Sequence, residues 1–409
     1  MTTYGLIGHP LGHSFSKEVH EAMGKYKYRL LDLDPQEMKD FLAGRNFRGL
    51  SVTIPYKQAV IEFCDKLTDR AKSIGAVNTL YWEEEAGERI LVGHNTDYDG
   101  FLYTAKKGGI DFDSKTVLIL GTGGTSKTAC AAAEDNGAKT IYFASREKGG
   151  TVHQGYEVIA YDALDEVSSR IDIIVNTTPV GMYPGNLEKP VSLKNFPNCR
   201  GVIDVIYNPL RTALIMEAEE LGIKTATGLP MIVAQATAAA EKFLGKPEGD
   251  KDLTGRNEII LEELKFRKEN IVLIGMPGCG KTTYGKTLAR ETGRTFVDLD
   301  REVEVDAGKT IPEIFEAEGE KTFRRYESEA AGKWGKEHGL IIATGGGIVT
   351  GEENYRILHQ NGRIIWLKRP LTELPVDGRP LSQGQGALEK IAEERMPLYE
   401  QWADEVKDE

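Results

Sequence analysis

The sequence has few cysteines, no long apolar run and no excess of basic residues. Only four cysteines occur in 409 residues, and no two form a C-x-x-C pair. Such scattered cysteines indicate free thiols in a reducing compartment rather than a disulfide framework or a zinc site. The formal net charge of −12 argues against a general nucleic-acid binder and against an anionic membrane surface as partner.

Signals for membrane insertion or export are also missing. No run reaches the roughly 18 apolar residues of a membrane-spanning helix, and the first residues show no basic flank before a long apolar core. We therefore expect a cytoplasmic protein with neither nucleic-acid nor membrane partners. The length of 409 residues predicts two to three domains, and neither an internal repeat nor a low-complexity tract interrupts them.

A phosphate-binding loop lies about two-thirds of the way along the chain. The segment GMPGCGKTT at 275–283 follows the apolar run 271–274 and precedes a helix-like segment. This is the P-loop arrangement, in which glycines let backbone N–H groups surround a phosphate at a helix N-terminus. The motif predicts an ATP site with Mg²⁺ on the threonine hydroxyl. The predicted ATP contacts are Gly275, Gly278, Cys279, Gly280, Lys281, Thr282 and Thr283.

A second glycine loop lies in the first half of the chain. The apolar, β-branched run 116–120 leads into GTGG at 121–124, an Ala-rich helix-like segment at 125–136 and a further strand at 140–144. This βαβ pattern predicts a dinucleotide at the helix N-terminus. The second strand ends in Ser145, Arg146, Glu147 and Lys148. The two basic residues suit a 2′-phosphate, so NADP is favoured over NAD, although the glutamate keeps NAD open.

Two residues of opposite charge each follow a predicted strand in the N-terminal region. Lys57 comes just after the strand at 49–54, and Asp97 ends the strand pair at 75–80 and 93–97. An ammonium and a carboxylate held together can protonate a carbonyl oxygen, or deprotonate an alcohol, as a hydride moves. The alternative is a surface salt bridge worth at most about 1 kcal/mol, and spacing alone favours that alternative.

From about residue 4 to residue 244 the sequence resembles shikimate dehydrogenase, the NADP-linked reductase of 3-dehydroshikimate. The motifs GHPLGHSFS, SVTIPYK, GAVNT, NTD, GTGG, SRE, VNTTPVGM, DVIYNP and GLPMIVAQ occur in the family's order. The resemblance implies that Lys57 and Asp97 are the catalytic pair. It implies substrate contacts by Ser14, Ser16, Thr53, Asn78, Tyr207 and Gln235, and cofactor contacts by Gly121, Gly123, Gly124, Ser145, Arg146, Thr177 and Met231.

The resemblance also implies a discontinuous α/β substrate domain, formed by residues 1–105 and 230–247 around a Rossmann NADP domain at 106–229. The helix-like segment 231–244 should therefore fold back onto the N-terminal part. Two departures from the family's pattern, Lys17 in place of a common proline and Tyr98-Asp99 between the NTD motif and Gly100, could alter loop geometry.

Polar and glycine residues also follow the strands after the P-loop. Asp298 and Asp300 end the strand at 295–297, where two carboxylates could serve a metal and a substrate hydroxyl. Triple glycine at 345–347 follows the strand at 340–343 and would let backbone approach a ligand closely. A paired arginine at 324–325 and Arg395 stand further from these strands, and each alone is more often a solvated surface residue.

Taken together, residues 270–404 resemble shikimate kinase. The resemblance implies that Thr282 and Asp298 hold Mg²⁺ and that Asp300 is a candidate base. It further implies that arginines bind the shikimate carboxylate, which suits their bidentate geometry, and that Glu327 supports the site. The implied kinase residues are Lys281, Asp300, Arg324, Gly345, Gly346, Gly347, Arg395 and the lid arginine Arg379, in a lid that is several residues shorter than usual.

The predicted organisation is a shikimate dehydrogenase-like part at 1–247, a linker and connecting helix at 248–268, and a P-loop, NMP-kinase-like parallel-sheet α/β domain at 269–409. The polar, glycine-bearing segment 245–255 is the best linker candidate.

The predicted function is a bifunctional enzyme of aromatic amino-acid biosynthesis that uses NADP(H), ATP and Mg²⁺. It would reduce 3-dehydroshikimate and then phosphorylate shikimate. One alternative is an active dehydrogenase whose P-loop domain only senses ATP. A second keeps both activities but lets the first domain use quinate or NAD, and a third is a scaffold with inactive sites.

Overall fold

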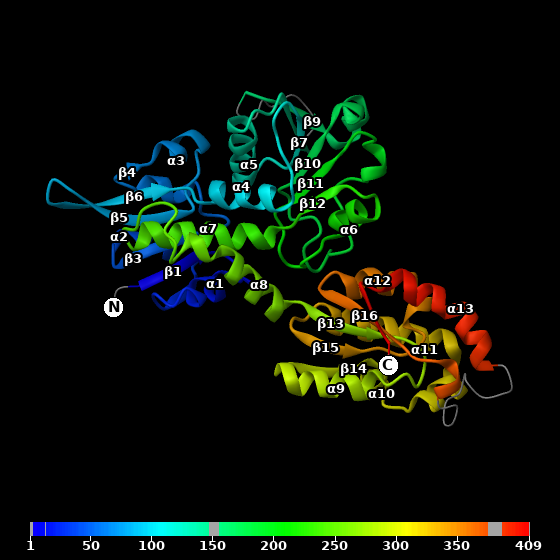
Figure 1. The fold of residues 1–409 in the computed structure, drawn as a ribbon. Coiled ribbons are helices and arrows are strands. Elements are labelled where there is room, and N and C mark those ends of the chain that lie inside the picture. Colours follow the sequence, from blue (N-terminus) through cyan, green and yellow to red (C-terminus); the bar gives the residue numbers. More distant parts are fainter. Residues whose placement is uncertain (1–2, 13, 147–154, 375–386, 409) are drawn as a thin grey trace. The chain divides into compact units, whose positions relative to one another are not determined.

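The chain forms two compact units, residues Met1–Leu264 and Lys265–Glu409 (Figure 1). The computed structural model describes residues 3–12, 14–146, 155–374 and 387–408. Within these residues, the helices are all too short or too polar to cross a membrane. Each unit is built around its own mainly parallel sheet or sheets, so the chain is of the α/β class.

Unit 1 begins with a mixed six-stranded sheet in the order β2-β1-β3-β5-β6-β4. Its first three strands are parallel, whereas β5 runs antiparallel to both β3 and β6. The strands are β1 (Thr3–Gly8), β2 (Tyr28–Asp32), β3 (Phe47–Val52), β4 (Lys66–Leu67), β5 (Thr79–Glu85) and β6 (Glu88–His94). The carboxyl end of β3 therefore leads into the Lys57 loop.

The charged stretch at 82–89 forms the outer part of the β5–β6 hairpin. The two strands stay paired from Thr79 opposite His94 to Glu85 opposite Glu88. The indole N–H of Trp82 donates to the Phe47 carbonyl at 2.9 Å, and the Arg89 guanidinium lies 4.1 Å from the Trp82 ring centre. Residues 84–89 are all exposed, so this end of the ribbon is solvated on both faces.

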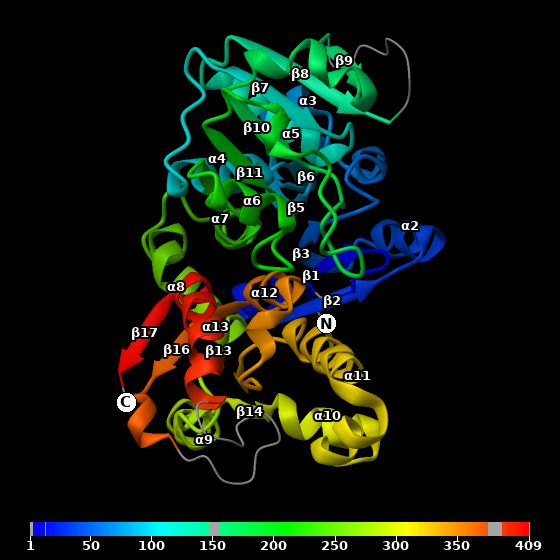
Figure 2. The same cartoon turned by 90° about the vertical axis from the view of Figure 1, so that its right-hand side faces the viewer.

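The second sheet of unit 1 is parallel, in the order β12-β11-β10-β7-β8-β9 (Figure 1 and Figure 2). Alternate residues of β7 point into two different hydrophobic cores. Val117 lies in the core that includes α4 and α5, and Leu118 lies in the core that includes α6. Burial on both faces explains why this strand is wholly apolar. The elements are α4 (Asp97–Lys107), β7 (Thr116–Leu120), α5 (Gly124–Asp135), β8 (Thr140–Ser145), β9 (Glu157–Ala160), β10 (Ile173–Asn176), β11 (Gly201–Asp204), α6 (Ala213–Glu220) and β12 (Lys224–Ala226).

Helix α7 (Gly228–Phe243) returns to the first sheet and packs against α4, α1 (Ser16–Ala22), β3 and β5. Close packing depends on glycine. A Cβ on Gly100 of α4 would lie 2.6 Å from the Met231 carbonyl oxygen and 3.0 Å from Cβ of Gln235. Similarly, a Cβ on Gly49 of β3 would collide with the Phe243 ring. These contacts place Gln235, far along the chain, beside the N-terminal strands.

The segment after α7, predicted as a linker, is held on unit 1. Its Leu253 is 1% exposed and lies in the same core cluster as Val233 of α7. The buried Glu241 carboxylate accepts hydrogen bonds from the Asp250 N–H at 2.7 Å and the Thr254 hydroxyl at 2.8 Å. The polar composition of residues 245–255 hides this anchoring, because one leucine and one buried carboxylate provide it.

The following helix, α8 (Asn257–Lys268), also contributes to the core of unit 1. Ile260, Leu261 and Leu264 are buried in the α7 cluster. At its first turn, Glu258 accepts a 2.7 Å hydrogen bond from Lys107 of α4. The boundary between the compact units thus falls inside α8, at Leu264 and Lys265.

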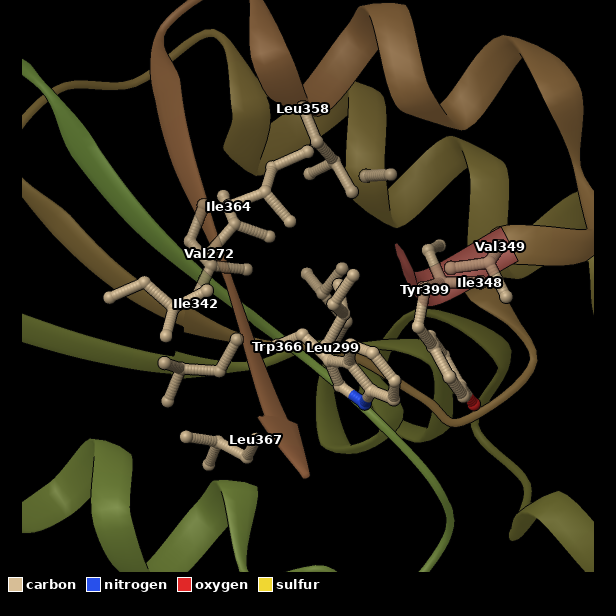
Figure 3. Close-up of a cluster of buried hydrophobic side chains, with 14 of the residues drawn as sticks. Val272, Leu299, Ile342, Ile348, Val349, Leu358, Ile364, Trp366, Leu367 and Tyr399 are labelled. Carbon is tan, nitrogen blue, oxygen red and sulfur yellow. The ribbon is translucent and has the colours of Figure 1, made fainter. Parts of the chain in front are cut away.

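Unit 2 is a five-stranded parallel sheet in the order β14-β15-β13-β16-β17. Figure 3 shows Val272, Ile342 and Ile364 from three adjacent strands pointing into one core. The elements are β13 (Asn270–Ile274), α9 (Lys281–Thr292), β14 (Thr295–Asp298), α10 (Leu299–Ala307), α11 (Ile311–Gly335), β15 (Leu340–Ala343), α12 (Glu352–His359), β16 (Gly362–Lys368), α13 (Ala387–Trp402) and β17 (Glu405–Asp408).

Two helices of unit 2 carry the arginines that the sequence singles out. Helix α11, which carries Arg324, is bent at Gly319, whose φ of 81° is non-helical. Helix α13 begins at Ala387, so Arg395 lies in its middle turns. Tyr399 follows one turn later and is fully buried against Trp366 of β16.

Candidate active sites

The Lys57 ammonium and the Asp97 carboxylate meet in unit 1. Nζ donates to Oδ2 at 2.6 Å, and the two side chains are only 14% and 9% exposed. Lys57 follows β3, and Asp97 is the first residue of α4. A short and mostly buried pair differs from an exposed salt bridge, since solvent screens it weakly. The geometry therefore favours the chemical interpretation of these residues over the surface one.

Asn78 fixes the other oxygen of Asp97. Its Nδ2 donates to Asp97 Oδ1 at 2.8 Å and lies 3.5 Å from Oε1 of Gln235. Its Oδ1 accepts from the Thr96 N–H at 2.7 Å and from the Thr79 hydroxyl at 2.9 Å. The amide is fully hydrogen-bonded in one orientation, so Asp97 cannot rotate away from Lys57 without losing a bond.

Hydroxyl groups gather at the entrance to α1. Ser14 donates to the Ser16 hydroxyl at 3.1 Å and also hydrogen-bonds the Tyr207 phenol. Burial raises the pKa of Tyr207, so its phenol is neutral at neutral pH. Thr53, after β3, is half-buried, and its methyl group lies beside Gly8. Neutral hydroxyl donors of this kind can bind a carboxylate.

The glycine loop after β7 is shaped for close approach to a ligand. Gly121 has a φ of 99°, and a Cβ there would lie 3.0 Å from Thr178 and 3.1 Å from the Thr177 hydroxyl. Around a Cβ on Gly123 there is open space, whereas one on Gly124 would lie 3.8 Å from Cδ of Lys57. The α5 N-terminus, where a dinucleotide phosphate fits, thus lies beside the Lys57 side chain.

The remaining predicted cofactor residues lie at the same end of the second sheet or on α7. Ser145 ends β8 and Arg146 is exposed just after it, whereas Glu147 and Lys148 fall outside the described residues. Met231 is buried in the first turns of α7.

A buried carboxylate supports this loop and was missed by the sequence interpretation. Asp204, at the end of β11, accepts from the Thr212 hydroxyl at 2.7 Å and from Asn176 at 3.1 Å. Burial raises its pKa to about 6, against these hydrogen bonds. Asn176 in turn accepts from the Thr178 hydroxyl at 2.7 Å. The network fixes the strand ends that border Gly121.

In unit 2, the P-loop curls around the Lys281 ammonium. Nζ donates to the carbonyl oxygens of Gly275 at 2.8 Å and of Met276 at 3.1 Å. Gly275, Gly278 and Gly280 all have positive φ, and a Cβ on Gly275 would lie 2.5 Å from the Leu367 carbonyl. The loop conformation therefore requires glycine, and its amides and lysine fit a nucleotide phosphate.

Two oxygen ligands lie at the start of α9 and the end of β14. The Thr282 hydroxyl donates to Asp298 Oδ2 at 2.8 Å. The described residues contain no cluster of three or more histidine, cysteine or carboxylate side chains that could hold a metal. Mg²⁺ in phosphoryl-transfer sites needs only one or two protein oxygens besides phosphates and water. This donor pair therefore fits Mg²⁺ held together with a nucleotide.

A second group of charges lies under the triple glycine. Arg324 donates to Glu327 Oε2 at 2.8 Å, and a Cβ on Gly347 would collide with the Arg324 guanidinium. Arg395 is 5% exposed and hydrogen-bonds Tyr399. Both guanidinium groups lower the pKa of Glu327, which burial raises more strongly. Two arginines therefore flank one buried glutamate.

The other two glycines touch different neighbours. A Cβ on Gly345 would lie 2.5 Å from Oδ1 of Asp300, and one on Gly346 would lie 2.7 Å from Pro277 of the P-loop. The Tyr399 hydroxyl donates to the Gly346 carbonyl. The predicted lid residue Arg379 falls outside the described residues.

Comparisons with known proteins identify both units. Over 250 residues the chain is 36% identical to the shikimate dehydrogenase (NADP(+)) of Clostridium beijerinckii. The aligned residues cover 59% of this chain and 91% of that protein. The chain belongs to the shikimate dehydrogenase family. The family model described as the shikimate dehydrogenase substrate binding domain matches residues 6–80, and the model described as shikimate kinase matches residues 277–409. Unit 1 is hereafter the dehydrogenase unit, and unit 2 the kinase unit.

Other relatives agree. The Methanococcus vannielii shikimate dehydrogenase (NADP(+)) is 37% identical over 265 residues, which is 60% of this chain and 92% of that protein. A crystal structure of a chorismate mutase/shikimate 5-dehydrogenase fusion protein from Clostridium acetobutylicum aligns with a TM-score of 0.58 and 34% identity, covering 65% of this chain and 97% of that one. These relatives confirm the predicted fold class of the dehydrogenase unit, and the kinase model confirms that of the kinase unit.

Proposed function

We propose that this chain catalyses two consecutive steps of the shikimate pathway. The dehydrogenase unit reduces 3-dehydroshikimate to shikimate with NADPH, and the kinase unit phosphorylates shikimate to shikimate 3-phosphate with MgATP. The proposal covers a substrate part at 1–105 and 230–247, an NADP part at 106–229 and a kinase part at 269–409. A cytoplasmic location is included, supported by free cysteines and an acidic surface charge.

In the dehydrogenase unit, the observation that supports the proposal most is the buried Lys57–Asp97 contact of 2.6 Å beside the glycine loop. NADPH supplies the hydride. Lys57 gives a proton to the carbonyl oxygen, and Asp97 holds that ammonium in position. The neutral hydroxyls of Ser14, Ser16 and Tyr207 bind the substrate carboxylate.

The dehydrogenase unit needs other groups to hold the ring hydroxyls and the cofactor. Thr53, Asn78 and Gln235 contact the ring hydroxyls. Gly121, Gly123 and Gly124 would hold the cofactor phosphates at the α5 N-terminus, and Thr177 and Met231 would contact another part of the cofactor. Ser145 and Arg146 bind the 2′-phosphate, for which a guanidinium is suited.

In the kinase unit, MgATP supplies the phosphoryl group. The Lys281 ammonium exchanges its hydrogen bonds to the loop carbonyls for contacts with the ATP phosphates, while Thr282 and Asp298 hold Mg²⁺. Asp300 accepts the proton of the substrate hydroxyl, and Arg324 and Arg395 bind the carboxylate. Arg379 of the predicted lid, which lies outside the described residues, would complete the charge stabilisation.

A coupled assay tests both halves. Wild-type protein given dehydroshikimate, NADPH and MgATP should form shikimate 3-phosphate, measured by chromatography with NADPH consumption and ADP release. Lys57→Ala should abolish product from dehydroshikimate but not from shikimate. Lys281→Ala should stop at shikimate. Shikimate as the sole product of the wild-type chain would overturn the kinase half.

A further inference from the structure

Tyr98 and Asp99, which depart from the family's pattern, join α4 to the proposed NADP part of the dehydrogenase unit. Tyr98 follows Asp97 in the first turn of α4 and is 8% exposed. Its phenol donates to Oδ2 of Asp135, the last residue of α5, at 2.7 Å. Burial and this hydrogen bond raise the pKa of Tyr98 to about 12, so the phenol keeps the proton that it donates. A glycine directly after Asp97 could not form this contact.

A second set of contacts holds the ring of Tyr98. The Arg70 guanidinium, on α3 (Asp69–Ile74), lies 4.3 Å from the centre of that ring and donates to Oδ1 of Asp99 at 2.8 Å. The cation attracts the face of the ring, and the ion pair keeps the guanidinium in place. The first turn of α4 is therefore held by α3 on one side and by α5 on another.

These contacts close a ring of elements around the proposed site. At its N-terminal end, α5 lies beside the lysine of the charged pair, since a Cβ on Gly124 would be 3.8 Å from Cδ of Lys57. Lys57 contacts Asp97, the neighbour of Tyr98, and Tyr98 contacts the C-terminal residue of α5. A 12-residue helix is about 18 Å long, so α5 is held at two distant points against the elements that carry the pair.

The phenol of Tyr98 does more than fill space. Its ring belongs to the core cluster that includes Ala129 and Ala133 of α5 and Phe101 of α4. A phenylalanine would serve that packing equally well. The hydroxyl adds a directed contact, because a hydrogen bond depends on both distance and angle, and it fixes one end of α5 relative to the first turn of α4.

We propose that Tyr98 is a positioning residue for hydride transfer, and that its phenol holds α5 so that a cofactor on the glycine loop meets the substrate beside Lys57 and Asp97. The inference rests on the proposed dehydrogenase function and extends it. In that step the carbonyl carbon accepts the hydride of NADPH, which becomes NADP⁺, and the carbonyl oxygen accepts the proton of Lys57. Other residues bind the substrate and the cofactor, so Tyr98 acts on their alignment. A misplacement of about 1 Å can cost about 100-fold in rate.

Tyr98→Phe in the full-length chain tests the inference, because it removes the hydroxyl and keeps the ring and its contact with Arg70. We expect kcat for NADP-linked shikimate oxidation to fall about tenfold, since alignment is lost. KM for shikimate and KM for NADP should each change less than about threefold, since both binding sites remain. Phosphorylation of shikimate by the same preparation should be unchanged.

Tyr103→Phe is the matched control. Tyr103 lies on the same helix, and its phenol also donates to a carboxylate, that of Glu258 on α8. Because α8 carries no part of the proposed NADP site, this variant should keep kcat within about twofold of wild type. An equal fall of kcat in both variants would show that any loosening of α4 slows the reaction, and the inference would be wrong.

The other end of the contact provides a second route if Tyr98→Phe does not fold. Asp135→Asn keeps a carbonyl oxygen that accepts from the phenol, so kcat should stay near the wild-type value, whereas Asp135→Ala should lower kcat about tenfold. The double variant Tyr98→Phe/Asp135→Ala should be no slower than either single variant, because both substitutions remove the same contact.

Three results would overturn the inference. They are an unchanged kcat in Tyr98→Phe and Asp135→Ala, additive losses in the double variant, and a raised KM for NADP with kcat retained. The last result would mean that the contact serves cofactor binding alone. Absence of any NADPH consumption by wild-type protein with dehydroshikimate would instead refute the proposed dehydrogenase function, so the two failures are distinguishable.

Discussion

The two units place an ionisable proton carrier beside a glycine loop in opposite electrostatic settings. In the dehydrogenase unit, Lys57 touches its counter-ion directly at 2.6 Å, and a fully bonded amide holds that counter-ion. In the kinase unit, Asp300 has no cation in hydrogen-bond contact among the described residues, and a second carboxylate lies across Gly345. An ammonium held by a carboxylate can give a proton to a carbonyl oxygen, whereas a carboxylate beside another carboxylate holds a proton more strongly.

The units also differ in which parts of the sequence form their folds. The dehydrogenase unit needs segments from both ends of its sequence, since α7 and α8 return to the N-terminal sheet. The kinase unit is a single run of alternating strands and helices. Changes at the C-terminal end of the dehydrogenase unit should therefore act on stability, whereas changes at its charged pair should act on rate alone.

The largest expected effect comes from where the chain is cut. Ending the chain after residue 247 removes Leu253, Ile260, Leu261 and Leu264, all buried against α7. At about 1.5–3 kcal/mol for each of the four large apolar side chains, the dehydrogenase unit should lose about 6–12 kcal/mol, comparable with the whole stability of a domain. Denaturant unfolding, followed by NADP-linked shikimate oxidation, measures this loss.

The control is a chain that ends after residue 268, which keeps α8. It should retain dehydrogenase activity and unfold at the denaturant concentration of the full-length protein's dehydrogenase unit. Equal stability of the two truncated chains would show that residues 248–268 are only a linker.

Asp97→Asn should produce the next largest effect, and on one reaction only. The amide keeps the shape of the side chain and cannot neutralise Lys57. We expect dehydrogenase kcat to fall by about 10²–10³-fold, which corresponds to about 3–4 kcal/mol. Phosphorylation of added shikimate by the same preparation should stay within about twofold. A matching loss of both activities would mean that the substitution unfolds the chain rather than disabling the pair.

A smaller effect concerns the stability of the dehydrogenase unit at acidic pH. His20 of α1 is fully buried, stacked on Tyr28 with ring centres 3.8 Å apart, and burial lowers its pKa to about 3. In the unfolded chain a histidine titrates near pH 6.5, so only the unfolded state binds the proton between these values. The stability of the dehydrogenase unit is therefore present above pH 6.5 and falls with pH below it, by about 2 kcal/mol at pH 5 for this residue.

His20→Phe keeps a stacked ring and should remove the part of this slope that comes from His20. His94, whose pKa burial also lowers to about 3, keeps its own part in both proteins. Urea unfolding at pH 7 and pH 5 compares the variant with wild type. The buried carboxylates Asp204 and Asp300, with raised pKa, change stability in the opposite direction and are the same in both proteins. An identical pH dependence in variant and wild type would exclude His20 as its source.

The sequence interpretation succeeded where local pattern determines structure. Strand, glycine loop and helix recur at Gly121 and Gly275, and both loops form as their spacing predicts. The family motifs predict one site that contains Lys57, Asp97, Asn78 and Gln235. In the structure these four side chains lie next to one another.

What escaped prediction depends on contacts between distant segments. Asp204 looks like an ordinary polar strand end until Asn176 and Thr212 surround it. Residues 245–255 have the composition of a linker, because their anchors, Leu253 and the Glu241 carboxylate, carry no local signal. Long-range packing overrides composition in such segments.

The smallest effect tests the contact that joins the two ends of the dehydrogenase unit. Gly100 of α4 faces α7, and Gly100→Ala would place a methyl group 2.6 Å from the Met231 carbonyl and 3.0 Å from Cβ of Gln235. Because α7 must shift to accept it, we expect a loss of about 1–2 kcal/mol of stability, by overpacking.

The shift should also be visible in catalysis, because Gln235 would move away from Asn78. KM for dehydroshikimate should rise several-fold with a smaller change in kcat, whereas phosphorylation stays unchanged. Gly332→Ala in α11 of the kinase unit is the matched control, since a Cβ there meets nothing within 4 Å and alanine favours a helix. Equal stability and equal KM in Gly100→Ala and Gly332→Ala would show that α4 and α7 are not packed closely enough to position Gln235. The dehydrogenase site would then not depend on the return of α7 to the N-terminal sheet.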